Sequence, residues 1–164
     1  MMNGGFTQIL ATILAALLVW AAIVDLRTRT IPDWLSIAVA LMAPLFWWAD
    51  GIAFYPDAVE RICGAFLIFT IFFGMFALGG MGGGDVKLGT AFGLWFAPLA
   101  TLKFFVVTSL AGGLVSIAAW IYHHKFRRRQ GKTEVPYGVA IAFGGLWLLA
   151  QRFLNQFAGL SLGN

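Results

Sequence analysis

Apolar runs recur along almost the whole of this 164-residue chain, separated by short polar or glycine-rich stretches. Several of them approach the roughly 20 residues that an α-helix needs to cross a bilayer. Hydrophobic residues make up 60% of the chain and charged residues only 11%, whereas soluble domains carry about 25% charged residues. A soluble fold of this length has too little interior to bury so much apolar surface. The chain is therefore predicted to be an all-α, polytopic membrane bundle whose excess apolar surface contacts lipid.

Six transmembrane helices are predicted, forming a single integral-membrane domain over residues 1–164. The fourth is too short to cross about 30 Å of hydrocarbon at about 1.5 Å per residue, so we expect it to begin below the membrane surface. No basic region precedes the first segment, which is expected to be a retained helix rather than a cleaved signal peptide. The expected spans are Phe6–Val24, Trp34–Ala49, Ile62–Leu78, Val86–Leu99, Leu102–Tyr122 and Tyr137–Leu154.

Basic residues are distributed unevenly between the two ends of these spans. Of the 11 Lys and Arg residues, all but Arg61, Lys103 and Arg152 follow the first, third and fifth spans. The positive-inside rule places those loops in the cytoplasm and the N-terminus outside. The same rule accounts for the net charge of +4, so the expected partner is the lipid bilayer and not nucleic acid. The basic loop His123–Lys132 is expected to contact anionic lipid.

Two aspartates, Asp25 and Asp85, stand at the ends of predicted spans. Acidic side chains at membrane depth are costly and usually functional. Each aspartate continues into a stripe on its own helix face, and small residues in such stripes let membrane helices approach closely. If the two stripes pack together, the carboxylates meet at the cytoplasmic mouth of the bundle. The stripes are Ala22, Leu18, Ala15 and Ala11 on the first helix, and Gly89 and Gly93 on the fourth.

Two carboxyl groups within hydrogen-bonding reach cannot both ionise easily, so they share a proton. One can then act as a base toward water while the other acts as an acid toward a carbonyl oxygen. Amide hydrolysis by this route requires no metal ion or cofactor. Taken singly, Asp25 could be an interfacial residue near Arg27 and Arg29, and Asp85 could be the N-cap of a helix. Neither alternative explains why both aspartates lie at one face of the membrane.

The only cysteine, Cys63, lies within an apolar run and is expected to be a small buried side chain. One cysteine can form neither an internal disulfide nor a zinc knuckle, and the two histidines lack partner ligands. We therefore expect no metal site.

The glycine run 79–84 ends directly before Asp85. Glycine permits backbone conformations closed to other residues. Gly82, Gly83 and Gly84 are thus candidates for a mobile wall along which an extended substrate lies, although a plain flexible loop has the same composition.

Two further features flank the aspartates. Pro32 imposes an extended or turn geometry on Ile31 and starts the second helix ahead of Asp33. Lys87 lies two residues beyond Asp85. It could act on the acid pair, attract an acidic group of a substrate, or extend to the lipid headgroups.

Three patterns in this chain resemble the type IV prepilin peptidase family of membrane aspartyl proteases. The first is an Asp followed six residues later by Ile-Pro-Asn/Asp, here Asp25 with Ile31–Asp33. The second is Gly-x-Gly-Asp, here Gly82–Asp85. The third, Pro136–Ala142, is similar to the minimal members of the family that serve tight-adherence (Flp) pili.

The resemblance implies an aspartic endopeptidase of the bacterial inner membrane with Asp25 and Asp85 as its catalytic pair. It implies a prepilin-like substrate whose basic leader is removed at the cytoplasmic face, after a glycine that precedes a hydrophobic helix. The large members carry a cysteine-bearing cytoplasmic region and also N-methylate the new terminus. One cysteine and a short loop after Asp25 argue against methyltransferase activity here.

Two functions of other classes remain open from the sequence. A small proton-coupled transporter could relay protons through the aspartates, but repeats and broken helices would then be expected. A non-catalytic assembly factor for a pilus or secretion system could keep the fold, but one aspartate would then be expected to drift. The archaeal preflagellin peptidases share the two-aspartate pattern, and Pro136–Ala142 favours the bacterial branch. The sequence assigns no oligomeric state.

Overall fold

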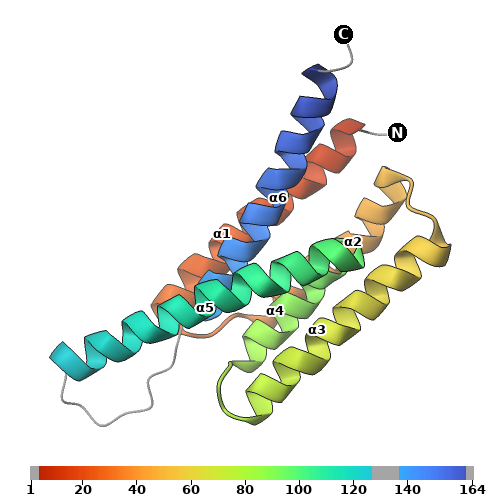
Figure 1. The fold of residues 1–164 in the computed structure, drawn as a ribbon. Helices are drawn as coiled ribbons and strands as arrows, with labels where there is room; N and C mark the ends of the chain where they lie inside the picture. Colours follow the sequence, from red (N-terminus) through yellow and green to blue (C-terminus); the bar gives the residue numbers. More distant parts are fainter. Residues whose placement is uncertain (1–3, 127–136, 162–164) are drawn as a thin grey trace.

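The computed structural model describes residues 4–126 and 137–161, and within these ranges the chain forms six α-helices and no strand (Figure 1). The prediction of a helical membrane protein is confirmed. A π-helical turn, η1, precedes the third α-helix. The elements are α1 (Gly4–Thr28), α2 (Asp33–Asp50), η1 (Phe54–Ala58), α3 (Val59–Ala77), α4 (Gly83–Gly93), α5 (Pro98–Phe126) and α6 (Tyr137–Ser161).

Four of these helices are long and apolar enough to cross a membrane, namely α1, α3 with its preceding turn, α5 and α6. By contrast α4 has 11 residues and extends for roughly 16 Å at 1.5 Å per residue, as its short apolar segment suggested. It ends at Gly93 rather than at the predicted Leu99. The reason is a turn that leads into Pro98, a residue well suited to the first position of a helix.

The predicted basic loop His123–Lys132 differs in part from the structure. Helix α5 continues to Phe126, so the loop's first four residues are helical. The rest of the loop, together with Pro136, lies outside the described residues.

The helices run up and down, so α1, α3 and α5 finish at one end of the bundle, while α1 starts and α6 finishes at the other (Figure 1). Helix α6 packs against α5 and α1, and α4 packs against α3 and α2. The connections after α1 and α3 therefore share one end with the last turns of α5.

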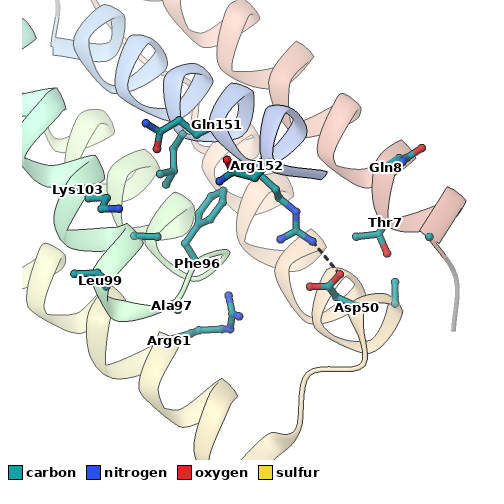
Figure 2. A pocket seen from close by; sticks show the side chains of 15 residues that line it. Thr7, Gln8, Asp50, Arg61, Phe96, Ala97, Leu99, Lys103, Gln151 and Arg152 are labelled. Atoms are coloured by element: carbon teal, nitrogen blue, oxygen red, sulfur yellow. Dashed lines mark hydrogen bonds and ion pairs between the residues drawn. The ribbon is translucent and has the colours of Figure 1, made fainter. Parts of the chain in front are cut away.

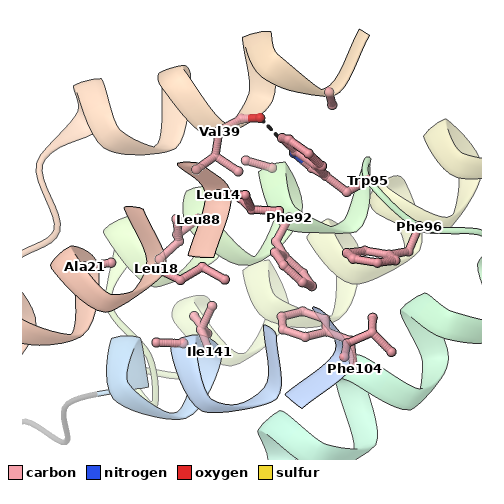
Figure 3. Close-up of a cluster of buried hydrophobic side chains, with 14 of the residues drawn as sticks. Leu14, Leu18, Ala21, Val39, Leu88, Phe92, Trp95, Phe96, Phe104 and Ile141 are labelled. Carbon is pink, nitrogen blue, oxygen red and sulfur yellow. Dashed lines mark hydrogen bonds between the residues drawn. The ribbon is translucent and has the colours of Figure 1, made fainter. Parts of the chain in front are cut away.

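The core forms where α1, α4 and α6 face one another (Figure 3). Leu14, Leu18 and Ala21 recur at helical spacing on α1, are fully buried, and lead directly to Asp25. Toward the other end, the Trp95 indole donates a hydrogen bond to the Val39 carbonyl at 2.9 Å, which ties the turn after α4 to α2.

Large apolar side chains also cover much of the outside of the bundle, as expected for a surface that contacts lipid. Leu41, Phe66 and Leu110 are each more than 60% exposed. Cys63 lies on this outer surface too. The expectation that it is buried is wrong, because it falls on the face of α3 turned away from α4 and α5.

The glycine stripe of α4 packs on α3, which corrects the expectation that it packs on α1. A Cβ atom at Gly89 would collide with the Phe72 ring, and one at Gly93 would lie 3.2 Å from the Ala65 Cα. Helix α1 packs mainly against α6 and α2. Only residues 78–82 separate α3 from α4, and helices joined by so short a connection usually pack side by side.

We expect Gly89→Ala to lower the melting temperature of the protein in detergent. The added methyl group must displace the buried Phe72 ring, and overpacking of this kind typically costs about 1–3 kcal/mol. The matched control is Gly74→Ala on α3, where a Cβ meets nothing within 4 Å. Equal melting temperatures for the two variants would contradict the α3–α4 packing described here.

Candidate active site

Asp25 lies in the last turn of α1, on the buried face of the helix, and is only 4% exposed. The helix ends where Arg29 adopts a left-handed φ of 56° and donates its N–H to the Asp25 carbonyl at 2.9 Å. The first amides of α6, those of Gly138 and Val139, face the Asp25 carboxylate and interact with it. Amides at a helix N-terminus have no acceptor within the helix, so they suit a carboxylate.

Asp85 is the third residue of α4 and is 6% exposed. The Gly82 N–H donates to Asp85 Oδ2 at 3.2 Å. Gly82 and not Asp85 is therefore the N-cap, and the carboxylate reaches back to the capping residue as in half of a capping box. This hydrogen bond holds one carboxylate oxygen in a defined position at the start of the helix.

The two aspartates come together at the same end of the bundle, close enough for their charges to interact. Each keeps one buried carboxylate oxygen that has no hydrogen-bond partner among the described residues, Oδ2 of Asp25 and Oδ1 of Asp85. Buried polar atoms are nearly always paired, so two free acceptor oxygens at one place are unusual. They can accept hydrogen bonds from water or from a substrate.

The two sequence motifs are in direct contact. A Cβ atom at Gly84 would lie 3.0 Å from both the Cβ and the carbonyl oxygen of Ile31. Glycine at this position lets the start of α4 approach the connection between α1 and α2. Pro32 is the N-cap of α2, with φ −68° and ψ 140°, so the second helix starts directly after it as expected. This contact between the start of α4 and the α1–α2 connection accompanies the approach of Asp85 to Asp25.

Lys87 binds Asp33 and neither member of the aspartate pair. Its Nζ lies 2.8 Å from Asp33 Oδ1, and the two side chains are 56% and 66% exposed. An exposed ion pair contributes about 0–1 kcal/mol, so its main consequence is to link the starts of α2 and α4.

The glycine run joins two helices. Gly79 ends α3 with a φ of +76°, and the Gly80 N–H donates to the Met75 carbonyl at 2.9 Å, a common helix C-terminal arrangement. Gly82 is the N-cap of α4, and Gly83 and Gly84 form its first turn. The expected wall of three glycines is therefore the start of a helix rather than a free loop.

Gly138 is a site residue that sequence reasoning did not single out. A Cβ atom there would lie 2.8 Å from Asp25 Oδ2 and 2.9 Å from the Ile31 side chain. Only glycine lets the start of α6 approach Asp25 this closely. The available signal was its place in the stretch Pro136–Ala142, which had suggested a family but no role.

The described residues contain no group of three His, Cys, Asp or Glu side chains able to hold a metal ion. Two neighbouring carboxyl groups can exchange protons with water and with a bound carbonyl compound.

Comparison with known proteins places this arrangement in a family. The family model for the type IV leader peptidase family matches residues 12–117, which include both aspartates. The prepilin leader peptidase/N-methyltransferase of Legionella pneumophila is 26% identical over 148 residues, covering 87% of this chain and 50% of the relative. Its counterpart in Xanthomonas campestris pv. campestris is 27% identical over 151 residues, covering 85% and 48%.

A third relative of the same name, from Aeromonas hydrophila, is 28% identical over 145 residues, covering 84% of this chain and 48% of the relative. The chain spans about half the length of the curated relatives it matches. No solved structure matches it. With a family match over well above half of its length and both motifs inside that match, the chain belongs to the type IV leader peptidase family.

Proposed function

We propose that this chain is an aspartic endopeptidase that removes the basic leader from type IV prepilins, with Flp-type prepilins as its substrates. The observation that carries the proposal is the pair of buried aspartates, each with a free carboxylate oxygen, at the contact between two motifs of a leader peptidase family. The relatives are named for both leader cleavage and N-methylation. We assign only the cleavage to this chain, because it has one cysteine and a short connection after Asp25.

Hydrolysis by this pair requires one carboxyl group to be ionised and the other to be protonated. One carboxylate takes a proton from a water molecule, whose oxygen attacks the scissile carbonyl carbon, while the protonated partner donates to the carbonyl oxygen. When the C–N bond breaks, the leaving amine takes the proton that came from water, and a hydroxyl of the tetrahedral intermediate returns its proton to the other carboxylate. The pair again holds one proton and is ready for another cycle. The Gly82 amide holds the Asp85 carboxylate in place during these steps, and the first amides of α6 favour the ionised form of Asp25.

The proposed orientation places the aspartate pair at the cytoplasmic face of the bacterial inner membrane. Asp25 lies in the last turn of α1, and most of the basic residues follow α1, α3 and α5 in the sequence. By the positive-inside rule this end faces the cytoplasm. A basic leader would reach the pair there, while the hydrophobic helix of the prepilin remains in the bilayer.

The direct test is cleavage of a purified Flp-type prepilin by the full chain in detergent, followed by mass spectrometry of the product. We expect a single cut after the glycine that precedes the hydrophobic helix, and a product terminus without a methyl group. The matched control is the same prepilin with a bulky residue in place of that glycine, which should stay uncut. Failure to cut several different prepilins would reject the peptidase function in favour of transport or assembly.

A further inference from the structure

A cavity of about 990 Å³ opens at the other end of the bundle from the aspartate pair (Figure 2). It is lined by the start of α1, the end of α2, the starts of α3 and α5, and the later part of α6. None of the residues assigned to the candidate active site lines it. Because it lies at the ends of these helices, we expect the cavity to be near the boundary between headgroups and acyl chains.

Three cationic side chains from three helices meet in this cavity, whereas Asp50 is the only acidic residue in its lining. Arg152 is paired, with Nη2 2.9 Å from Asp50 Oδ1 (Figure 2). Arg61 donates from Nη1 to the Trp95 carbonyl at 2.7 Å, and its buried Nε has no partner among the described residues. Lys103 forms no hydrogen bond or ion pair within the described part of the chain.

The charge in the lining therefore remains positive after the one internal pair is formed. Asp57 and Glu60 act on Arg61 from the preceding turn and the start of α3, but they do not line the cavity. A basic side chain at the end of a membrane span often extends outward to the headgroups. Here Arg61, Lys103 and Arg152 converge on one concave site instead.

The N-terminus of α5 adds unpaired donors to the same site. Leu99 and Ala100 of its first turn line the cavity. The first hydrogen bond of this helix runs from the Thr101 N–H to the Ala97 carbonyl at 3.0 Å. Ala97, which precedes the helix, has no polar side chain that could cap the first turn. The amides of Leu99 and Ala100 are therefore available to an anion.

The remaining lining is suited to an acyl chain. Phe96, Leu148 and Ala49 are buried apolar side chains, and Leu99 is 67% exposed at the rim. We propose that the cavity binds an anionic phospholipid, with its phosphate at Arg61, Lys103 and the first amides of α5, and with an acyl chain along Phe96 and Leu99. A free phosphate ion carries the same kind of charge as the lipid headgroup, but it has no acyl chain to contact the apolar lining.

Native mass spectrometry of the full chain, released from detergent micelles, tests this site. The probes are phosphatidylglycerol and phosphatidylcholine with identical acyl chains, and inorganic phosphate. We expect one retained phosphatidylglycerol and much less phosphatidylcholine. In Lys103→Gln the affinity for phosphatidylglycerol should fall about fivefold, the usual contribution of one cation beside anionic lipid. The variant breaks no internal contact, and its thermal unfolding should match the wild type.

The matched control is Arg27→Gln, which removes one charge from an exposed position at the other end of the bundle and should leave phosphatidylglycerol binding unchanged. Equal retention of the two lipids, or equal affinity in Lys103→Gln and wild type, would overturn the proposal. Binding of inorganic phosphate that depends on Lys103 would assign the cavity to a soluble anion and reject the lipid. Prepilin cleavage is not part of the readout, so the result stands apart from the proposed peptidase function.

Discussion

Replacing either Asp25 or Asp85 by asparagine is expected to lower the rate of prepilin cleavage by roughly a thousandfold or more, since general acid and base catalysis each contribute about 10²–10⁴. Asparagine keeps the size and shape of the side chain but cannot take up and release the proton. Because the two carboxyl groups act as one unit, the double variant should be no slower than either single variant. The measurement is the initial rate of product formation at equal enzyme concentration.

The same variants should not lose stability, which separates a catalytic role from a structural one. Two buried carboxyl groups beside each other are unfavourable, and a neutral amide at one position relieves that cost. We therefore expect melting temperatures equal to or above that of the wild type. Asp57→Asn is the matched control, because it makes the same chemical change at an exposed position in η1, outside the candidate active site. This variant should retain full activity. A near-normal rate in Asp25→Asn or Asp85→Asn would rule out the two-carboxylate mechanism.

Gly138→Ala is expected to reduce cleavage about a hundredfold while the protein still folds. The new Cβ would lie 2.8 Å from Asp25 Oδ2 and 2.9 Å from Ile31 Cδ1, well inside van der Waals contact. Either the carboxylate or the start of α6 must move, and a displacement of about 1 Å at a reacting group can cost about 10² in rate. The loss should appear mainly in kcat, because Gly138 contacts the carboxylate that takes part in the proposed chemistry.

Gly113→Ala provides the comparison for this variant. Gly113 lies in α5, where an added Cβ meets nothing within 4 Å. It should keep normal activity and gain a little stability, as alanine does over glycine inside a helix. If Gly138→Ala cleaves as fast as Gly113→Ala, the close approach of α6 to Asp25 is not needed for catalysis.

Local features of the sequence were sufficient for much of this description. Hydropathy depends on runs of neighbouring residues, so the helical membrane fold and the short α4 could be predicted without knowing any contact. The extended backbone at Pro32 is likewise a property of one residue and its neighbour. The family was recognisable because its motifs are contiguous, and the family match over residues 12–117 confirms it.

The tertiary structure decided which faces meet. The stripe at Gly89 and Gly93 fits any closely approaching helix, and it packs on α3 rather than on the predicted α1. Likewise, the contact of Gly138 with Asp25, the pairing of Lys87 with Asp33 and the convergence of three cations on one cavity join segments far apart in the chain. In lipid, apolar faces are all equally well solvated, so hydrophobicity does not select a helix's neighbour. Complementary shape and hydrogen bonds between helices make that selection. Both depend on residues far apart in the sequence and form only when the helices pack.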